Sequence, residues 1–274
     1  FRTCGGAVFG IEICEDVWAP IPPSNNLVLA GADIIFNLSA SDELLGKHAY
    51  LKSLLSQQSA RMLSGYVYSS SGFGESTQDV VYGGNTLIYE NGQLLCEGER
   101  FALDNQLMTA QIDIESLRAD RRNNTTFVNA QRCIQAHNVR IIKTEDIVQR
   151  DFVLERTVDP RPFIPTHNNM EESCSEILNI QVMGLARRLL HTHAATVVIG
   201  VSGGLDSTLA LLVCIKTFDK LKLNRKNIIG VTMPGFGTTG RTYNNAMRLM
   251  ENLGITIKEI NISKSVLQHF EDIG

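Results

Sequence analysis

The most informative run of residues combines glycines with hydroxyl and carboxylate side chains: Gly200, Val201, Ser202, Gly203, Gly204, Leu205, Asp206 and Ser207. It follows an apolar segment typical of a buried strand and precedes one typical of a helix. Backbone N–H groups at such a helix start bind anions, and glycines let the backbone come close to a phosphate. Asp206 would repel a bare phosphate, so its useful role is through a bound Mg²⁺. The run predicts a phosphate-binding loop, against the alternative of a Gly-rich turn without a ligand. It is not a Walker A loop, because the Lys of that motif is absent.

A second cue lies in Thr232–Thr239, which follows the next expected strand and reads T-M-P-G-F-G-T-T. Ligands in open α/β sheets bind beyond the carboxyl ends of the strands. This loop is therefore a candidate for contact with the same nucleotide. An ordinary connection between a strand and a helix explains the stretch equally well.

Cys14 ends an apolar run and is followed directly by Glu15 and Asp16. A strand in this position would deliver the thiol to a sheet edge or to the following turn. Cysteine usage alone favours a buried structural thiol at such a place. A catalytic interpretation depends on the residues around Cys14.

The other cysteines are scattered along the chain, and none of the six forms a C-x-x-C pair. This spacing argues against a disulfide framework and against a zinc site. His191 and His193 form an H-x-H pair without further ligands nearby in the sequence, so metal binding is not expected there. Free thiols fit a reducing cytosol, and a cytoplasmic protein is expected.

Composition is that of a globular protein with a sizeable core: 43% of the 274 residues are hydrophobic and 20% are charged. The length favours about two domains. A net charge of -4 without a Lys/Arg run argues against a nucleic-acid partner. No apolar run reaches the roughly 18–20 residues of a membrane-spanning helix, and no signal peptide is visible after Phe1.

The elements that must position Cys14 alternate between strands and helices. Apolar periodicity predicts strands at Gly6–Cys14, Asp33–Leu38, Tyr66–Ser70 and Leu107–Ile114, helices at Asn25–Ala32 and His48–Leu63, and a hairpin over Gly83–Phe101 with its turn at Glu90-Asn91-Gly92. From Asp120 to His167 the sequence is polar, irregular and rich in proline, which predicts a connection between domains.

A second α/β pattern begins near Met170 and surrounds the glycine-rich run. It predicts helices at Glu171–His191, Ser207–Phe218 and Tyr243–Leu253, and strands at Ala195–Val201, Ile228–Met233 and Ile255–Ile262. Strands alternating with helices indicate a parallel sheet. Because the chain stops at Gly274 just after a new helix begins, truncation at both ends is expected.

Two motifs carry a family resemblance. The segment I-C-E-D-x-W around Cys14, with the later prolines and N-L-S-A-S at Asn37–Ser41, resembles the glutaminase half of NAD synthetases. The pattern S-G-G-x-D-S resembles the pyrophosphate loop of N-type ATP pyrophosphatases. Together they resemble the glutamine-dependent NAD synthetases over nearly the whole chain. The implied fold is the C-terminal part of a nitrilase-like α-β-β-α sandwich (1–120), a linker (121–168) and the start of a Rossmann-like doubly wound sheet (169–274).

The resemblance implies a role for each motif residue. Cys14 would be the nucleophile, and Glu15, Ser41 and Lys47 would hold glutamine. The run Gly200–Ser207 and Met233 would bind ATP, with Asp206 as the metal ligand. The family's catalytic Glu and Lys precede the cysteine, and there is no room for them before Phe1. This piece alone is therefore expected to be inactive.

The implied activity is the ATP-driven amidation of nicotinic acid adenine dinucleotide to NAD, with ammonia from glutamine and with AMP and pyrophosphate as products. ATP and Mg²⁺ are the implied cofactors, and a homo-oligomer is the implied assembly, without nucleic acid or membrane. Two alternatives remain open. One is another glutamine- or ammonia-fed ATP pyrophosphatase with a different acceptor, and the other is a non-catalytic nucleotide-binding relative.

Overall fold

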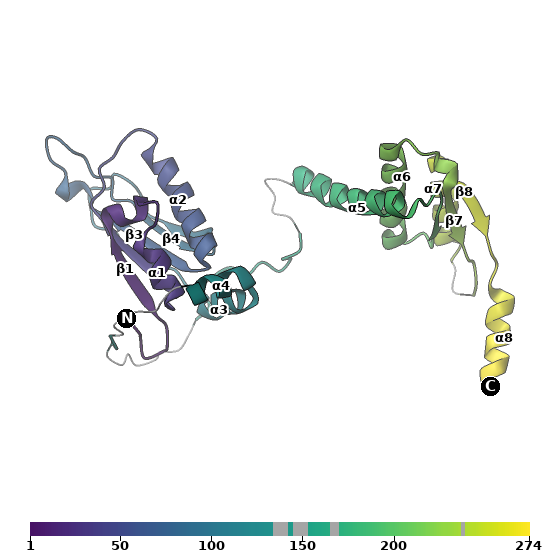
Figure 1. Cartoon of the computed structure of the whole chain (residues 1–274), viewed down its shortest axis with the longest axis horizontal. Helices are drawn as coiled ribbons and strands as arrows, with labels where there is room; N and C mark the ends of the chain where they lie inside the picture. The colour runs from purple at the N-terminus through teal and green to yellow at the C-terminus, as the bar shows by residue number, and fades with distance from the viewer. Residues whose placement is uncertain (134–141, 145–152, 165–169, 237–238) are drawn as a thin grey trace. The chain divides into compact units, whose positions relative to one another are not determined.

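The computed structural model describes residues 1–133, 142–144, 153–164, 170–236 and 239–274 (Figure 1). The chain divides into two compact units, Phe1–Val158 and Asp159–Gly274. Among the described residues, no helix combines the length and the apolar character that crossing a membrane requires.

Unit 1 is built on a five-stranded mixed sheet in the order β1-β2-β3-β4-β5. Its strands are β1 (Phe9–Ile13), β2 (Ile34–Ser39), β3 (Gly65–Ser70), β4 (Thr86–Glu90) and β5 (Gln93–Glu97). The first three strands are parallel, and β4 and β5 add to β3 as an antiparallel hairpin. The predicted α/β class is thereby confirmed for this unit.

Helices connect the parallel strands where the apolar spacing predicts them. The helical elements of unit 1 are the 3-10 turn η1 (Cys14–Trp18), α1 (Pro23–Leu29), α2 (Lys47–Met62), the turn η2 (Phe73–Glu75), α3 (Ile114–Asn123) and α4 (Thr125–Cys133). Pro23 suits the first position of α1, because the N–H that proline lacks has no helical partner there. The hairpin turn has Asn91 at φ 46° and Gly92 at φ 83°, so both residues take the left-handed conformation that short hairpin turns need.

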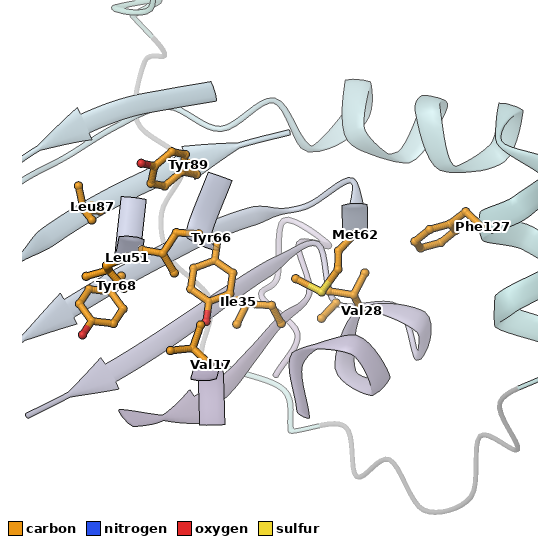
Figure 2. Packing of buried hydrophobic residues seen from close by; sticks show 12 residues of the cluster. Val17, Val28, Ile35, Leu51, Met62, Tyr66, Tyr68, Leu87, Tyr89 and Phe127 are labelled. Carbon is orange, nitrogen blue, oxygen red and sulfur yellow. The ribbon is translucent and has the colours of Figure 1, made fainter. Parts of the chain in front are cut away.

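The core of unit 1 lies on one face of the sheet, under α1, α2 and η1 (Figure 2). Tyr66, Ile35 and Leu55 are fully buried there. The alternate side chains of β1 and β2 point to the other face, which we call the open face: Phe9, Ile11, Ile34, Phe36 and Leu38. Leu38 on this face is 53% exposed. One side of the sheet is thus packed, and the other presents apolar side chains.

Two expectations for unit 1 are wrong. Residues 107–113 form no strand, because their backbone has no ladder partner; instead the Gln111 side chain binds the carbonyl of Val153 and the N–H of Glu155. The predicted irregular region beginning at Asp120 is helical as far as Cys133. Asn124, which suggests a loop in sequence, accepts a hydrogen bond from the Phe127 N–H at 3.0 Å and so starts α4. Pro165 and His167 lie outside the described residues.

Unit 2 contains a three-stranded parallel sheet in the order β6-β7-β8. The elements are α5 (Met170–Thr192), β6 (Val197–Gly200), α6 (Leu205–Leu221), the turn η4 (Arg225–Asn227), β7 (Ile228–Thr232), α7 (Gly240–Leu253), β8 (Thr256–Glu259) and α8 (Ser263–Ile273). Phe218, Ile228 and Met250 are fully buried and join α6, β7 and α7 into one core. Each predicted strand and helix of this unit is present, which confirms the alternating pattern.

Two candidate active sites

Cys14 occupies an elbow between β1 and η1. Its backbone has φ 50°, in the left-handed region that non-glycine residues rarely adopt. This conformation costs about 1–2 kcal/mol for a residue with a Cβ. Such strain persists where the surrounding structure enforces it, and it is concentrated at functional sites. The thiol is partly exposed and in no disulfide, so a ligand can reach it.

Side chains on both sides hold the elbow in place. Asp16 accepts a hydrogen bond from the Ile13 N–H at 2.8 Å. The Asn37 side-chain amide donates to the Cys14 carbonyl oxygen at 3.5 Å. Val17 is 2% exposed and anchors η1 in the core. The thiol is therefore presented by a fixed turn.

The three residues predicted to bind glutamine lie in two different places in the structure. Glu15 is exposed and belongs to η1 itself. The Lys47 ammonium lies 5.6 Å from the ring centroid of Trp18, also in η1. Ser41 is instead tied to the end of β3, because its N–H donates to the Ser70 hydroxyl at 3.3 Å. Glu15 and Lys47 are thus brought to the elbow turn, while Ser41 is fixed at the neighbouring strand ends.

Asp42 is a neighbour that sequence reasoning missed. The Lys47 ammonium donates to both its carbonyl oxygen and its carboxylate oxygen, each at 2.9 Å. This hydrogen bond and the positive charge lower the pKa of the Asp42 carboxyl. An ammonium group has three donors. Asp42 takes two, so one remains for a ligand.

A polar cluster adjoins these residues at the same ends of the strands. Glu43 accepts a hydrogen bond from Arg100 at 2.6 Å, and Asn85 is hydrogen-bonded to both Glu43 and His48. Gly83 lies directly against this carboxylate, because a Cβ there would be 2.1 Å from a Glu43 carboxylate oxygen and the Glu43 side chain would have to move. The cluster brings together residues that are distant in sequence, so no local sequence motif predicts it.

The glycine-rich run has the strand–turn–helix context that phosphate binding requires. β6 ends at Gly200, and α6 begins at Leu205. The Ser207 hydroxyl lies 3.2 Å from that of Ser202 and donates to the Gly204 carbonyl at 3.1 Å. These contacts fold the run into a turn whose backbone N–H groups stand at the start of α6.

Asp206 is exposed in the first turn of α6. Among the described residues, no group of three or more His, Cys, Asp or Glu side chains could hold a metal ion. The donor set still fits Mg²⁺ on a nucleotide, because that ion takes one or two protein carboxylates together with phosphate oxygens. The metal role of Asp206 stays a prediction.

A pocket of about 350 Å³ opens beside the run, at the carboxyl ends of β6 and β7. Its lining residues are Gly200, Val201, Ser202, Val231, Thr232, Met233 and Thr242. Met233 is 51% exposed, and its terminal methyl lies 4.0 Å from where a Cβ of Gly200 would be. The two sequence cues therefore meet at one pocket. Thr242 joins them from α7, and no spacing rule points to it. Gly237 and Thr238 of the second cue lie outside the described residues.

Family models match both units of the chain. The carbon-nitrogen hydrolase model matches residues 1–122, and the NAD synthase model matches residues 177–273. The glutamine-dependent NAD(+) synthetase of Mycobacterium bovis is 40% identical over 279 aligned positions, which cover 98% of this chain. The chain is a homologue of the glutamine-dependent NAD(+) synthetases. The predicted resemblance is confirmed.

Other glutamine-dependent NAD(+) synthetases match over similar spans. That of Thermotoga maritima is 28% identical and covers 92% of this chain. The chain spans about 40% of the length of both relatives. A solved glutamine-dependent NAD+ synthetase from Acinetobacter baumannii, in complex with ADP, is 20% identical with a TM-score of 0.36 over 97% of this chain and 40% of its own. That similarity is too low to carry an argument about the sites.

Proposed function

We propose that this chain is part of a longer enzyme that makes NAD from nicotinic acid adenine dinucleotide, glutamine and ATP. The observation that best supports this is the pairing of two sites in one chain. A cysteine at a strained elbow and an S-G-G-L-D-S turn at a helix start each have the local structure that their chemistry needs. Either motif alone fits many enzymes, and their combination fits an amidotransferase that feeds a synthetase.

At the first site, the sulfur of Cys14 attacks the side-chain amide carbon of glutamine. The C–N bond breaks, ammonia leaves, and a γ-glutamyl thioester forms. Water then hydrolyses the thioester and frees glutamate. The remaining Lys47 donor suits the α-carboxylate of glutamine, and the exposed Glu15 carboxylate suits its α-ammonium group. A thiol needs a base to become a thiolate. In the family pattern that base precedes the cysteine.

At the second site, the N–H groups at the start of α6, with Ser202 and Ser207, receive the ATP phosphates. Met233 lines the pocket at the ends of β6 and β7 and would contact the adenine there. Mg²⁺ at Asp206 would offset the negative charge of the phosphates. The carboxylate of the acceptor attacks the α-phosphorus, and pyrophosphate leaves. Ammonia then attacks the activated carbonyl, and AMP leaves. A carboxylate is a poor electrophile, and the adenylate supplies its leaving group.

A synthetase with another acceptor, or a non-catalytic nucleotide-binding relative, is the alternative. By family resemblance the whole protein is a cytoplasmic homo-oligomer.

The deciding experiment supplies the full-length protein with glutamine, Mg·ATP and nicotinic acid adenine dinucleotide, and measures NAD, AMP and pyrophosphate. Equal amounts of the three products support the proposal. Pyrophosphate release with some other carboxylate acceptor, and none with this one, would move the protein to a different synthetase. ATP binding without pyrophosphate release from any acceptor would indicate a non-catalytic relative.

A further inference from the structure

Glu12 is a buried carboxylate that the proposed mechanism does not use. It lies on β1 two residues before Cys14 and is 2% exposed. Burying a carboxylate is unfavourable unless hydrogen bonds or a counter-charge compensate. None of the ion pairs between described residues includes Glu12. One of its oxygens accepts from the Ser24 N–H at 2.8 Å, and the other accepts from the Tyr66 hydroxyl.

These two partners, from α1 and β3, each bind one oxygen of the carboxylate. Ser24 is in the first turn of α1, where the preceding Pro22 provides no capping side chain. Glu12 therefore supplies the missing acceptor at that helix start, where negative charge is favourable. Tyr66 comes from β3 and is fully buried. Burial and the nearby Glu12 carboxylate raise the pKa of its hydroxyl, so Tyr66 remains a proton donor at neutral pH.

Asn37 connects this pair to the cysteine elbow. It is the register partner of Glu12 on the neighbouring strand, and it is fully buried. Its side-chain amide N–H donates to the Cys14 carbonyl oxygen at 3.5 Å. The Ser39 hydroxyl donates to the Asn37 oxygen at 2.6 Å, which fixes the orientation of the amide. Glu12 and Asn37 thus lie side by side on β1 and β2, with Glu12 bonded to Tyr66 and Asn37 bonded to Cys14.

The contact at Cys14 falls on the peptide that continues the elbow. A peptide unit is planar, so holding the Cys14 carbonyl also sets the plane of the Cys14–Glu15 bond. The Cys14 Cα, which carries the thiol side chain, belongs to that plane. Since the elbow has an unfavourable φ, it requires contacts that select it over a relaxed turn. A displacement of about 1 Å at a reacting atom can lower a rate about 100-fold.

We propose that Glu12 is a positioning residue for the glutaminase reaction. Its buried carboxylate ties the end of β1 to Ser24 and Tyr66, beside the Asn37 amide that binds the Cys14 carbonyl, and so keeps the Cys14 elbow in its strained geometry. This inference rests on the proposed function of Cys14 as the nucleophile. It assigns Glu12 no contact with glutamine.

The test uses Glu12→Gln and Tyr66→Phe in the full-length protein, with Glu90→Gln as the matched control. Glu90 is also a buried carboxylate of the same sheet, and it pairs with Arg156 away from the elbow. We expect each of the first two variants to lower kcat for glutamine 10- to 100-fold and to change KM less than twofold. Ammonia-driven NAD synthesis should stay within twofold of the wild-type rate. Because Glu12 and Tyr66 are bonded to each other and act together on the elbow, kcat for glutamine should fall no further in the double variant than in the more severe single variant.

Three results would overturn the proposal. They are an equal loss of kcat for glutamine in Glu90→Gln, an equal fall of ammonia-driven synthesis in the first two variants, and an unchanged kcat in folded variants.

Hydrogen exchange provides a readout that does not need activity. Amides of residues 13–18 should exchange at least tenfold faster in Glu12→Gln and Tyr66→Phe, with β4 amides unchanged. If the wild type fails to hydrolyse glutamine, the proposed function fails, and the exchange data still decide whether Glu12 holds the elbow. Equal exchange in wild type and variants would then refute it.

Discussion

Gly203 lies against Thr242 so closely that a Cβ on Gly203 would be 2.1 Å from the Thr242 carbonyl oxygen. The first turn of α7 therefore packs directly on the glycine-rich turn before α6. Gly203 also has φ 83°, a conformation that glycine adopts without strain. The shape of the phosphate loop thus depends on α7 as well as on its own sequence.

Gly203→Ala should weaken Mg·ATP binding at least tenfold and lower the free energy of unfolding by more than about 2 kcal/mol. The left-handed conformation alone contributes about 1–2 kcal/mol of this, and the clash with backbone adds to it. Gly204→Ala is the matched control, because its Cβ would meet only the Ser202 hydroxyl, at 3.5 Å. Titration calorimetry and urea unfolding measure the two effects. Equal behaviour of the two variants would contradict the packing argument.

Cys14→Ala and Cys14→Gly should both remove glutamine-driven NAD synthesis and leave ammonia-driven synthesis intact. The glycine variant should be more stable than the alanine variant by about 1 kcal/mol, because glycine relieves the strain at φ 50°. At an ordinary strand position the order would be reversed. Activity assays with each nitrogen source and thermal unfolding check both statements. Loss of ammonia-driven synthesis would contradict a separate glutaminase site.

Asp33→Asn should destabilise unit 1 by about 1.5–3 kcal/mol, the usual contribution of hydrogen bonds to a charged group. Asp33 is 1% exposed, and Arg118 donates to its two oxygens at 2.9 and 2.6 Å. Arg121 lies 3.8 Å away, and burial lowers its pKa to about 10. Glu115→Gln, on the exposed face of α3, is the control and should change stability by less than about 0.5 kcal/mol. Urea unfolding distinguishes the two.

Lys47→Met should raise KM for glutamine 10- to 100-fold with little change in kcat, as expected for one charge-assisted hydrogen bond of about 1.5–3 kcal/mol. Lys52→Met on the same helix is the control, because Lys52 pairs with Glu97 at 2.6 Å. Steady-state kinetics of glutamine hydrolysis provide the measurement. An unchanged KM with a lower melting temperature would mean that Lys47 serves only its pairing with Asp42.

Glu97→Gln should show a pH-dependent loss of stability. The hydrogen bond from Lys52, and then the neighbouring His48, lower the pKa of Glu97 below its ordinary 4.5. A carboxyl with a lowered pKa stabilises the fold above its unfolded pKa, and this contribution is lost as pH falls through the folded value. The variant should therefore be less stable by about 0.2–1 kcal/mol at pH 7 and equal to wild type once the pH is well below 4.5. Unfolding curves at several pH values would show this convergence, and a gap that persists in acid would argue against the ion pair.

Local sequence patterns predicted the structure correctly where residue types and apolar periodicity indicate the same element. The apolar runs leading into Cys14 and Gly200 are strands, and the Asn91-Gly92 turn closes a hairpin as its residue types require. The segment Leu107–Ile114 failed because a strand needs a partner, and a sequence does not state which neighbours are available. At Asn124 the same side chain that suits a loop serves as a helix cap, so composition alone is ambiguous.

The site residues also divide into those that the sequence reveals and those that only the fold brings together. The nucleophile and the glycine-rich turn are contiguous in sequence and can be recognised. Asp42, Thr242 and Glu12 acquire their importance from partners on other elements, so no spacing rule identifies them. The left-handed backbone of Cys14 is similarly invisible in sequence, because cysteine has no special preference for that conformation.

The open face of the five-stranded sheet has a consequence for handling this chain on its own. Leu38 on this face is 53% exposed, and Ile13, its register partner at the end of β1, is 61% exposed. Contiguous apolar surface of this kind favours aggregation and adsorption to surfaces. Low solubility of the purified piece would then reflect this face and would say nothing against its fold. Charged substitutions on the open face, away from Cys14, offer a direct way to obtain a sample suited to spectroscopy.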